Sequence, residues 1–218
     1  MTDRSVIIGT VTMAQTALSR KQDHLIQQRS KILTTALELF SERGFAETPV
    51  REIAKRAGLA KGSLYLYFSS KKDLLEQVVK RYALLPELGD LVADVYELPF
   101  DEGFPRLVSR MWKLLRQRRR LARVLTREVF GHALRGAVFA KSVVRPANKV
   151  LADYFEAHIQ RGELRRVKTG PAARCLFGML WGFLLNQELM RTPRGETLSD
   201  EEVVRVICDI FTHGIVAR

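Results

Sequence analysis

The sequence predicts an all-α fold, with an N-terminal three-helix domain of the helix-turn-helix type followed by a C-terminal helical domain. Apolar residues recur every three to four positions along most of the 218-residue chain. Glycine, proline and N-cap residues separate these periodic segments, as they do at helix ends. No segment shows the alternation of a half-buried strand. The expected helices are Asp23–Arg43, Val50–Ala57, Lys61–Tyr67, Lys71 to about Leu85, Glu87–Leu98, Leu107–Arg116, Leu121–Leu134, Val138–Gln160, Pro171–Met190 and Glu201–Val216.

The composition favours a protein with a real core and a polyanionic partner. Hydrophobic residues make up 46% of the chain, and its formal net charge is +12. This charge balance favours binding to a polyanion such as nucleic acid or to an anionic membrane surface. No apolar run approaches the roughly 20 residues that a membrane-spanning helix needs. Cys175 and Cys208 lack metal-site spacing and predict neither a zinc site nor a disulfide framework, so we expect a cytoplasmic location.

Three segments are expected along the chain. Residues 1–22 are interpreted as a flexible leader, because the apolar run Val6–Thr12 is too short and too weakly flanked for a signal peptide. Met13 is an alternative start. Residues 23–70 form the helix-turn-helix domain, and residues 71–218 form the larger helical domain.

The most informative stretch runs from Thr48 to Leu75. Thr48 suits the N-cap of a short helix, and Pro49 suits its first position. Gly58 suits the left-handed conformation that ends a helix. Ser70 and Asp73 have the spacing of a capping box that opens the next helix. Two short helices around a tight turn predict a helix-turn-helix, with the second helix presented to a major groove.

The second short helix carries side chains suited to DNA. Lys61, Tyr65 and Tyr67 supply a cation and two phenols for phosphates, and Ser63 and Lys61 could also reach base edges. Gly62 allows close approach to the DNA backbone, and Lys71 is aimed at a phosphate. Leu64 and Phe68 are expected in the core, where the tyrosines could also belong. Between Arg20 and Arg81 there are 13 basic and 7 acidic residues, a local excess of six.

Catalysis is not supported by the sequence. The four histidines are scattered, and no metalloprotease, nucleophile-elbow, P-loop or dinucleotide-binding spacing occurs. We therefore expect no enzymatic activity, no cofactor and no metal site. The basic run Arg116–Arg120 has two readings: a solvated helix end, where cations favour the C-terminal dipole, or a second patch for nucleic acid or an acidic partner.

A specific motif set lies between Gly44 and Leu75. It comprises Gly44-Phe45, Thr48, Val50-Arg-Glu-Ile-Ala54, Ala57-Gly-Leu59, Lys61-Gly-Ser-Leu-Tyr65, Tyr67-Phe68, Ser70-Lys71 and Leu74-Leu75. With the upstream helix, this stretch of about 55 residues resembles the DNA-binding domain of TetR-family transcriptional regulators. The sequence departs from the family pattern at Pro49, where a second threonine is usual, and at Ala60, where a serine commonly caps the recognition helix.

The resemblance implies an all-helical homodimer that binds double-stranded DNA. It places phosphate contacts at Thr48, Lys61, Tyr65, Tyr67 and Lys71. It also implies that the C-terminal domain binds a small apolar or amphipathic ligand, and that Pro171–Met190 and Glu201–Val216 pair across a two-fold axis. Such proteins are usually repressors released from a palindromic operator by the ligand. The pocket candidates, for each of which ordinary core packing is an equal alternative, are Met111, Trp112, Leu115, Phe130, Phe139, Phe177, Trp181 and Asn186.

Two rival functions remain open at the sequence level. In the first, the chain binds DNA but its C-terminal domain docks a protein in place of a small molecule, for which the arginine cluster is the motive. In the second, the positive charge serves a membrane surface or an enzymatic role. A lack of salt-dependent binding to duplex DNA would favour the second rival.

Overall fold

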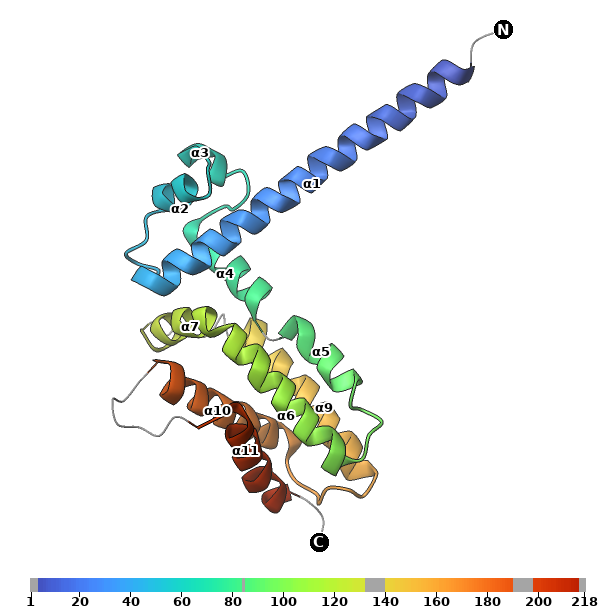
Figure 1. The fold of residues 1–218 in the computed structure, drawn as a ribbon, viewed down its shortest axis with the longest axis vertical. Coiled ribbons are helices and arrows are strands. Elements are labelled where there is room, and N and C mark those ends of the chain that lie inside the picture. Colours follow the sequence, from blue (N-terminus) through green and yellow to red (C-terminus); the bar gives the residue numbers. More distant parts are fainter. Residues whose placement is uncertain (1–3, 84, 132–139, 190–197, 216–218) are drawn as a thin grey trace. The chain divides into compact units, whose positions relative to one another are not determined.

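The computed structural model describes residues 4–83, 85–131, 140–189 and 198–215, apart from the side chains of residues 4–21, 61, 86, 128–131, 142, 188 and 189. Every regular element in these ranges is helical, which confirms the all-α prediction (Figure 1). The elements are α1 (Arg4–Arg43), α2 (Val50–Arg56), α3 (Lys61–Leu64), α4 (Lys71–Tyr82), α5 (Leu85–Ala93), α6 (Phe100–Gln117), α7 (Arg119–Gly131), the π-helical turn η1 (Ala140–Val144), α9 (Arg145–Gln160), α10 (Thr169–Leu184), the π-helical turn η2 (Leu185–Leu189) and α11 (Asp200–Ile215).

The chain divides into two compact units, the first ending at Val78 and the second beginning at Val79. The boundary lies inside α4, whereas the sequence placed it between residues 70 and 71. Helix α1 also begins at Arg4 and not at Asp23, so residues 4–22 continue the helix where a flexible leader was expected. This segment contains no proline, and several of its residues are good helix formers, so nothing in it forces the helix to start later.

In the N-terminal unit, helices α1 and α2 end where glycine was predicted to end them. Gly44 follows α1 with φ 91° and donates its N–H to the Phe40 carbonyl at 3.0 Å. Gly58 follows α2 with φ 76°. These positive φ angles are in the region that glycine adopts without the cost a Cβ would add. The periodic apolar face of α1 is buried as expected, at Ile32, Leu33, Ala36, Leu37 and Phe40.

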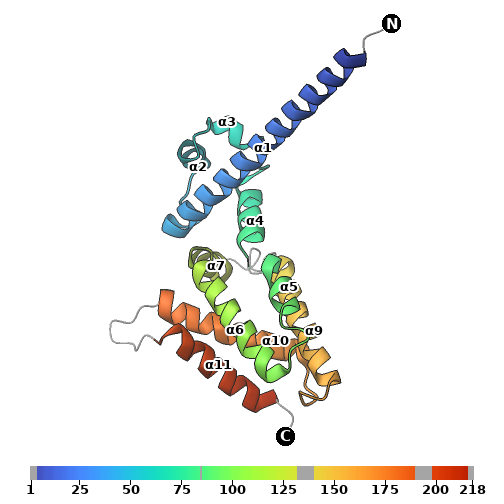
Figure 2. The same ribbon diagram turned by 45° about the vertical axis from the view of Figure 1, so that its right-hand side comes forward.

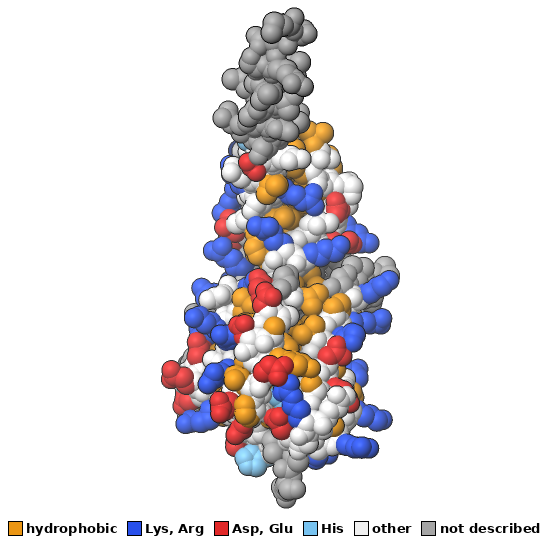
Figure 3. Space-filling model, turned by 90° about the vertical axis from the view of Figure 1, so that its right-hand side faces the viewer, with side chains coloured by type: hydrophobic (Ala, Val, Ile, Leu, Met, Phe, Trp, Pro, Cys, Tyr) orange, Lys and Arg blue, Asp and Glu red, His pale blue; other side chains and the backbone are white. Residues whose placement is uncertain are grey.

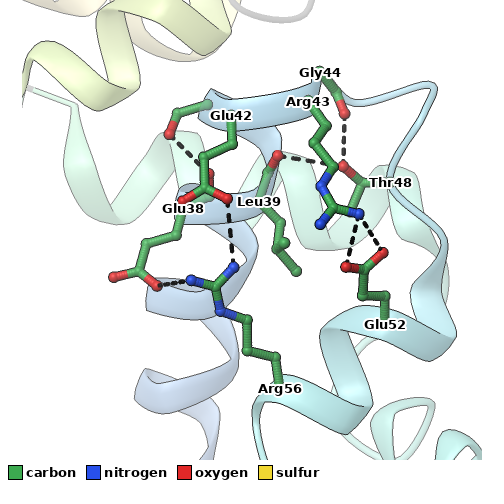
Figure 4. Close-up of polar contacts among 9 residues, drawn as sticks. Glu38, Leu39, Glu42, Arg43, Gly44, Thr48, Glu52 and Arg56 are labelled. Carbon is green, nitrogen blue, oxygen red and sulfur yellow. Dashed lines mark hydrogen bonds and ion pairs between the residues drawn. The ribbon is translucent and has the colours of Figure 1, made fainter.

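Ion pairs join α2 to the C-terminal end of α1 (Figure 4). Arg43 lies 2.8 Å from a carboxylate oxygen of Glu52, and Arg56 lies 3.4 Å from Glu42 and 3.9 Å from Glu38. All of these side chains are partly exposed, and exposed pairs contribute at most about 1 kcal/mol each. The buried side chains Ile53 and Ala54 therefore contribute most of what holds α2 in place.

Thr48 was predicted as the N-cap of α2, and this prediction is wrong. Pro49 occupies the N-cap position, and no side chain caps the helix. The Thr48 side chain is fully buried and turns back toward α1, with its hydroxyl donating to the Gly44 carbonyl at 2.7 Å (Figure 4). Because the chain turns sharply after Gly44, this hydroxyl reaches the carbonyl left exposed at the helix end. Thr48 thus closes α1 and does not open α2.

In the C-terminal unit, α6 is the central helix. It packs against α11, α5 and α10, and α9 packs against α10 and α5 (Figures 1 and 2). Its buried face carries Phe104, Leu107, Met111 and Leu115. Aromatic rings fill the space beside it, with Phe104 stacked on Phe211 of α11 at 5.2 Å between ring centroids. This unit is therefore a layered helical bundle built around one apolar core.

Two polar clusters fasten the ends of this bundle. At the start of α11, Asp200 accepts a hydrogen bond from Trp112 Nε1 at 2.8 Å and forms an ion pair with Arg116. At the end of α9, Glu163 accepts the Phe100 N–H at 2.5 Å and lies 3.1 Å from Nδ1 of the fully buried His158. Each cluster ties α6 to a helix that is distant in sequence.

Replacing Thr48 with valine tests the buried hydroxyl. We expect Thr48→Val to lower the free energy of unfolding by about 1–2 kcal/mol, because the Gly44 carbonyl loses its donor without gaining water. Urea unfolding measures the difference. Thr34→Val is the matched control: its hydroxyl donates to the Ser30 carbonyl in an exposed setting and should change stability by less than about 0.5 kcal/mol. Equal effects of the two substitutions would contradict the assignment.

The pH dependence of stability tests the Glu163 cluster. Burial raises the pKa of Glu163, but the hydrogen bonds from Phe100 and His158 and the charges of His158 and Arg161 outweigh it, so its pKa lies below the ordinary 4.5. A carboxyl with a lowered folded pKa contributes stability above about pH 4.5 and loses it as the pH falls through the folded pKa. We expect Glu163→Gln to remove part of the acid destabilisation seen in wild type.

The measurement is urea unfolding at several pH values from about 6 downward through 4.5, below which this loss begins. Glu156→Gln, an exposed position on α9, is the control and should follow wild type. Parallel pH curves for wild type and Glu163→Gln would show that the cluster contributes nothing to the pH dependence.

Candidate nucleic-acid interface and ligand cavity

The second helix of the helix-turn-helix is shorter than the sequence predicted. Helix α3 ends at Leu64, and Tyr65, Leu66 and Tyr67 continue as a tight turn in which each N–H donates to the carbonyl three residues earlier. Ala60 is its N-cap and supplies no side-chain hydrogen bond. Bonds to the third residue back wind the chain more tightly than an α-helix. The turn therefore brings consecutive side chains to different sides within a few residues.

This turn separates core side chains from exposed ones. Leu64 and Phe68 are fully buried, as predicted, whereas Tyr65 is 49% exposed and Leu66 is 84% exposed. Gly62 is exposed, and Ser63 and Tyr67 are half-buried. The Lys61 side chain lies outside the described part of the chain. The structure thus brings Gly62, Ser63, Tyr65 and Tyr67 together on one short segment.

Two residues near this segment were missed by sequence reasoning. Leu66 is the most exposed large apolar side chain of the described residues, and only its place between buried Leu64 and Phe68 could have indicated this. Arg29 of α1 donates to the Tyr67 carbonyl at 3.3 Å and lies 4.8 Å from the Phe68 ring centroid. No local spacing indicates this contact, because Arg29 and Tyr67 are 38 residues apart.

Thr48 and Lys71 were expected to contact phosphate. In the structure both side chains form hydrogen bonds within the protein. Thr48 is fully buried, so its hydroxyl does not reach a bound duplex in this conformation. Lys71 Nζ donates to the Ala46 carbonyl at 3.1 Å and lies 4.5 Å from the Phe45 ring centroid. Lys71 therefore ties the start of α4 to the α1–α2 connection. Thr48 is better described as a residue that positions the helix-turn-helix than as a DNA contact.

Basic side chains are not gathered into one block on the face drawn in Figure 3. Lys and Arg side chains alternate there with acidic ones, and apolar side chains lie exposed between them. On this face, therefore, no single basic patch marks a contact with nucleic acid.

The C-terminal unit contains an apolar cavity of about 30 Å³ bounded by α4, α6, α7, α9, α10 and η1. Three predicted pocket residues line it, namely Leu115, Phe177 and Trp181. Trp112 instead lines an open groove of about 870 Å³ between α6 and α11. Met111 is buried in the core and belongs to neither lining, and Asn186 is exposed and donates to the Gly182 carbonyl at 3.0 Å. Phe139 and the Phe130 side chain lie outside the described residues.

The arginines of the basic run Arg116–Arg120 have different partners and different exposure. Arg116 pairs with Asp200 at the start of α11. Arg118 pairs with Glu87 and donates to the carbonyls of Tyr82 and Ala83 at the end of α4. Arg119 and Arg120 are exposed. Arg116 lies partly exposed in the last turn of α6, as the first reading expects, whereas Arg118 joins α4, α5 and α6 within the protein, which neither reading predicts.

Other classes of site find no support among the described residues. Within those residues, no group of three or more histidine, cysteine or acidic side chains is placed to hold a metal ion. None of the described helices combines the length and the apolar character needed to cross a membrane.

Family models match both parts of the chain. Residues 32–78 match the model described as bacterial regulatory proteins of the tetR family. Residues 102–212, just over half of the chain, match the C-terminal domain of AefR-like transcriptional repressors. The two models cover the helix-turn-helix and most of the C-terminal unit.

Relatives and solved structures agree with these models. The HTH-type transcriptional regulator YerO of Bacillus subtilis is 39% identical over 56 residues, which are 26% of this chain but only 19% of YerO. The fatty acid metabolism regulator protein of B. subtilis is 27% identical over 164 residues, covering 72% of this chain and 80% of that protein. The transcriptional regulator FadR from B. subtilis, solved in complex with stearoyl-CoA, shares the fold with a TM-score of 0.72 at 22% identity, covering 85% of this chain and 98% of FadR.

The helix-turn-helix geometry and the two family models lead to the same assignment. A short exposed segment follows a buried scaffold in the N-terminal unit, and a helical bundle with an apolar cavity forms the second unit. The chain belongs to the TetR family of DNA-binding transcriptional regulators.

Proposed function

We propose that the chain is a ligand-responsive repressor that binds a palindromic operator as a homodimer. The observation that carries the proposal is the division of the α3 segment into buried Leu64 and Phe68 and exposed Tyr65 and Leu66. The exposed tyrosine and leucine lie side by side and form a surface that a bound partner can cover. In a dimer, two such segments enter successive major grooves roughly 34 Å apart.

The surroundings of Gly62 support the same contact. A Cβ built at this glycine meets no atom within 4 Å, and its φ is not positive. Neither packing nor backbone conformation within the protein therefore requires glycine here. A close external surface does explain it, because a residue without a side chain lets the backbone approach DNA. Lys61, one residue earlier, and Tyr65, one turn later, supply the phosphate contacts in this proposal.

Exposed apolar side chains on the last two helices support dimerisation. Helix α10 carries Phe177, Met179, Trp181 and Phe183, all partly exposed. Helix α11 carries Ile210, which is 59% exposed. Of these, Met179 and Phe183 do not line the cavity, and exposed apolar side chains on neighbouring helices can mark an interface between proteins. We assign α10 and α11 to the homodimer interface.

The ligand part of the proposal rests on the apolar cavity. The cavity contains Leu115, Phe177 and Trp181, which suit an apolar or amphipathic molecule. The complex of FadR with stearoyl-CoA is a precedent for an amphipathic ligand in a protein of the same fold. A ligand that binds a conformer with a different spacing of the two recognition segments lowers operator affinity by its differential affinity for the two states.

Selection of bound sequences from random duplex DNA tests the function as a whole. A palindromic consensus with half-sites about one helical turn apart is expected. Recovery of sequences without two-fold symmetry would contradict a homodimeric operator complex. Recovery of none would contradict specific DNA binding.

Alanine substitutions test the residues of the DNA contact. We expect Lys61→Ala and Tyr65→Ala each to lower affinity for the selected operator at least about tenfold, because each removes a phosphate or base-edge contact. Lys61→Ala should also reduce the slope of log affinity against log salt by about 1. Fluorescence anisotropy measures both, and sedimentation verifies that the oligomer is unchanged.

Matched controls for these variants lie in the C-terminal unit. Lys113→Ala removes a lysine and Tyr96→Ala removes an exposed tyrosine. Both should retain wild-type operator affinity. Loss of affinity in the controls as large as in Lys61→Ala and Tyr65→Ala would assign the effect to general charge or stability.

A charge on α11 tests the interface. Ile210→Asp should convert the dimer to a monomer in analytical ultracentrifugation, because an ionised carboxylate is too costly to bury unpaired between two subunits. Operator affinity should fall with it. Leu66→Asp, which changes a more exposed apolar side chain in the N-terminal unit, should leave the dimer intact. A dimeric Ile210→Asp protein would move the interface away from this face of α11.

The groove between α6 and α11 favours a second candidate function, in which the C-terminal unit docks a protein. This open groove of about 870 Å³ is lined by acidic and basic side chains, among them Asp101, Lys113, Glu201 and Arg205. Its size and polarity suit a protein segment better than a small apolar molecule. In this alternative the chain still binds DNA, but a docked protein controls it. Release of operator by a small molecule alone would contradict this alternative.

A further inference from the structure

Two polar side chains stand out in the lining of the apolar cavity. Most of the described lining is apolar, including Leu115, Phe177 and Trp181. Arg118, at the junction of α6 and α7, and Asn148, on α9, also line it. Tyr82 and Ala83, at the C-terminal end of α4, form another part of the wall. The cavity therefore has an apolar interior, with the Arg118 cation, the Asn148 amide and the C-terminal end of α4 in its wall.

Arg118 holds the end of α4 in place. Its Nη1 donates to the Tyr82 carbonyl at 3.3 Å and to the Ala83 carbonyl, and it lies 2.9 Å from Glu87 Oε2. Its Nη2 donates to Glu87 Oε1. The last carbonyls of a helix have no partners within the helix, and a cation there is favoured by the helix dipole. With only 19% of its side chain exposed, Arg118 is a largely desolvated cap on α4.

Asn148 provides a second and independent indication of a ligand. Its Oδ1 is buried, and no hydrogen-bond partner for it exists within the described part of the chain. A buried polar atom without a partner costs about 1–3 kcal/mol, so such atoms are uncommon unless something else satisfies them. Because the oxygen and nitrogen ends of an amide exchange by a half-turn of the side chain, Asn148 can present either an acceptor or a donor to the cavity.

In the present conformation the cavity is too small to hold an organic ligand. About 30 Å³ accommodates a water molecule, whereas pockets for organic ligands measure about 300–1,000 Å³. A ligand therefore binds a wider conformer. Tyr82 and Ala83 belong to the wall, and Arg118 is what holds them. Widening on this side requires Arg118 to give up the carbonyls of α4.

We propose that this cavity binds an amphipathic anion, with its apolar tail beside Phe177 and Trp181 and its acidic head group on Arg118 and Asn148. The head group takes the Arg118 guanidinium from the Tyr82 and Ala83 carbonyls and from Glu87, which uncaps the end of α4. A carboxylate or phosphate matches the fork of donors on a guanidinium, and a neutral or cationic head group does not. The inference rests on the proposed function, since uncapping α4 is the step that lowers operator affinity.

The test uses three probes with the same tail: dodecanoate, dodecan-1-ol and dodecyltrimethylammonium, each below its critical micelle concentration. Quenching of tryptophan fluorescence measures binding, because Trp181 lines the cavity. Anisotropy of the selected operator measures release. We expect dodecanoate to bind at least about tenfold more tightly than the alcohol, a margin within the strength of charge-assisted hydrogen bonds. The cationic probe should not bind, and only dodecanoate should release operator.

Two substitutions at the ion pair should act in opposite directions. Arg118→Gln should lower dodecanoate affinity about tenfold or more and remove its preference over the alcohol. Glu87→Gln keeps the arginine but removes its competing carboxylate, and should raise dodecanoate affinity and release operator at lower concentration. Arg123→Gln, which removes an exposed arginine of α7, controls for net charge and should behave as wild type. Asn148→Leu, which fills the site with an apolar side chain, should reduce the preference for the anion.

The outcomes separate this inference from the proposed function. If wild type binds the selected operator but dodecanoate and dodecan-1-ol bind equally, the anionic site is wrong and the repressor stands. If Arg118→Gln and Arg123→Gln weaken dodecanoate binding alike, attraction by the overall charge explains binding and the assignment of Arg118 fails. If dodecanoate binds through Arg118 without releasing operator, the coupling to α4 is wrong. If no operator sequence is selected in the absence of all probes, the proposed function itself is refuted.

Discussion

The burial of Leu64 and Phe68 is the constraint on which the candidate DNA-binding surface depends. These two side chains fix the start and the end of a five-residue segment, and the residues between them must then turn outward. The bonds to the third residue back wind this segment tightly enough to do so, and Arg29 holds its end from α1. Exposure of Tyr65 and Leu66 is thus a consequence of core packing. A mutation in the core would disturb the exposed pair without touching either residue.

Much of the fold could be predicted because its signals are local. Gly44 and Gly58 end helices through their own backbone conformations, and the Ser70 hydroxyl accepts the Asp73 N–H at the start of α4, as the spacing of these two residues predicts. The apolar period of α1 likewise identifies its buried face. Each of these features involves residues within a few positions of one another. In such cases the residues that form the sequence pattern are the same residues that make the stabilising contact.

The errors arose where the partner of a side chain is distant or where two local signals compete. Thr48 has the residue type of an N-cap, but the open carbonyl at the end of α1 is the acceptor that its hydroxyl meets. Arg118 belongs to a basic run, yet it meets α4 and α5 at sequence separations of 31–36 residues. Pattern reasoning counts charges along a helix and has no means of seeing such a partner. Sequence reasoning therefore proposed candidate contact residues on the α3 segment but missed the distant contacts, such as that of Arg29, which support the segment.

Arg118 also illustrates why a cap can act as a switch where a core contact cannot. A packed core resists change because every shift costs many contacts at once. A guanidinium shared among two carbonyls and one carboxylate can be transferred to a better acceptor, since the donor keeps all its hydrogen bonds and only the acceptors change. The carbonyls that Arg118 leaves lie at the end of α4, where water molecules can donate hydrogen bonds to them in its place. Such an exchange needs little net energy. Helix α4 runs from the N-terminal unit, which ends at Val78, into the C-terminal unit, so its last turn belongs to the same helix that closes the N-terminal unit.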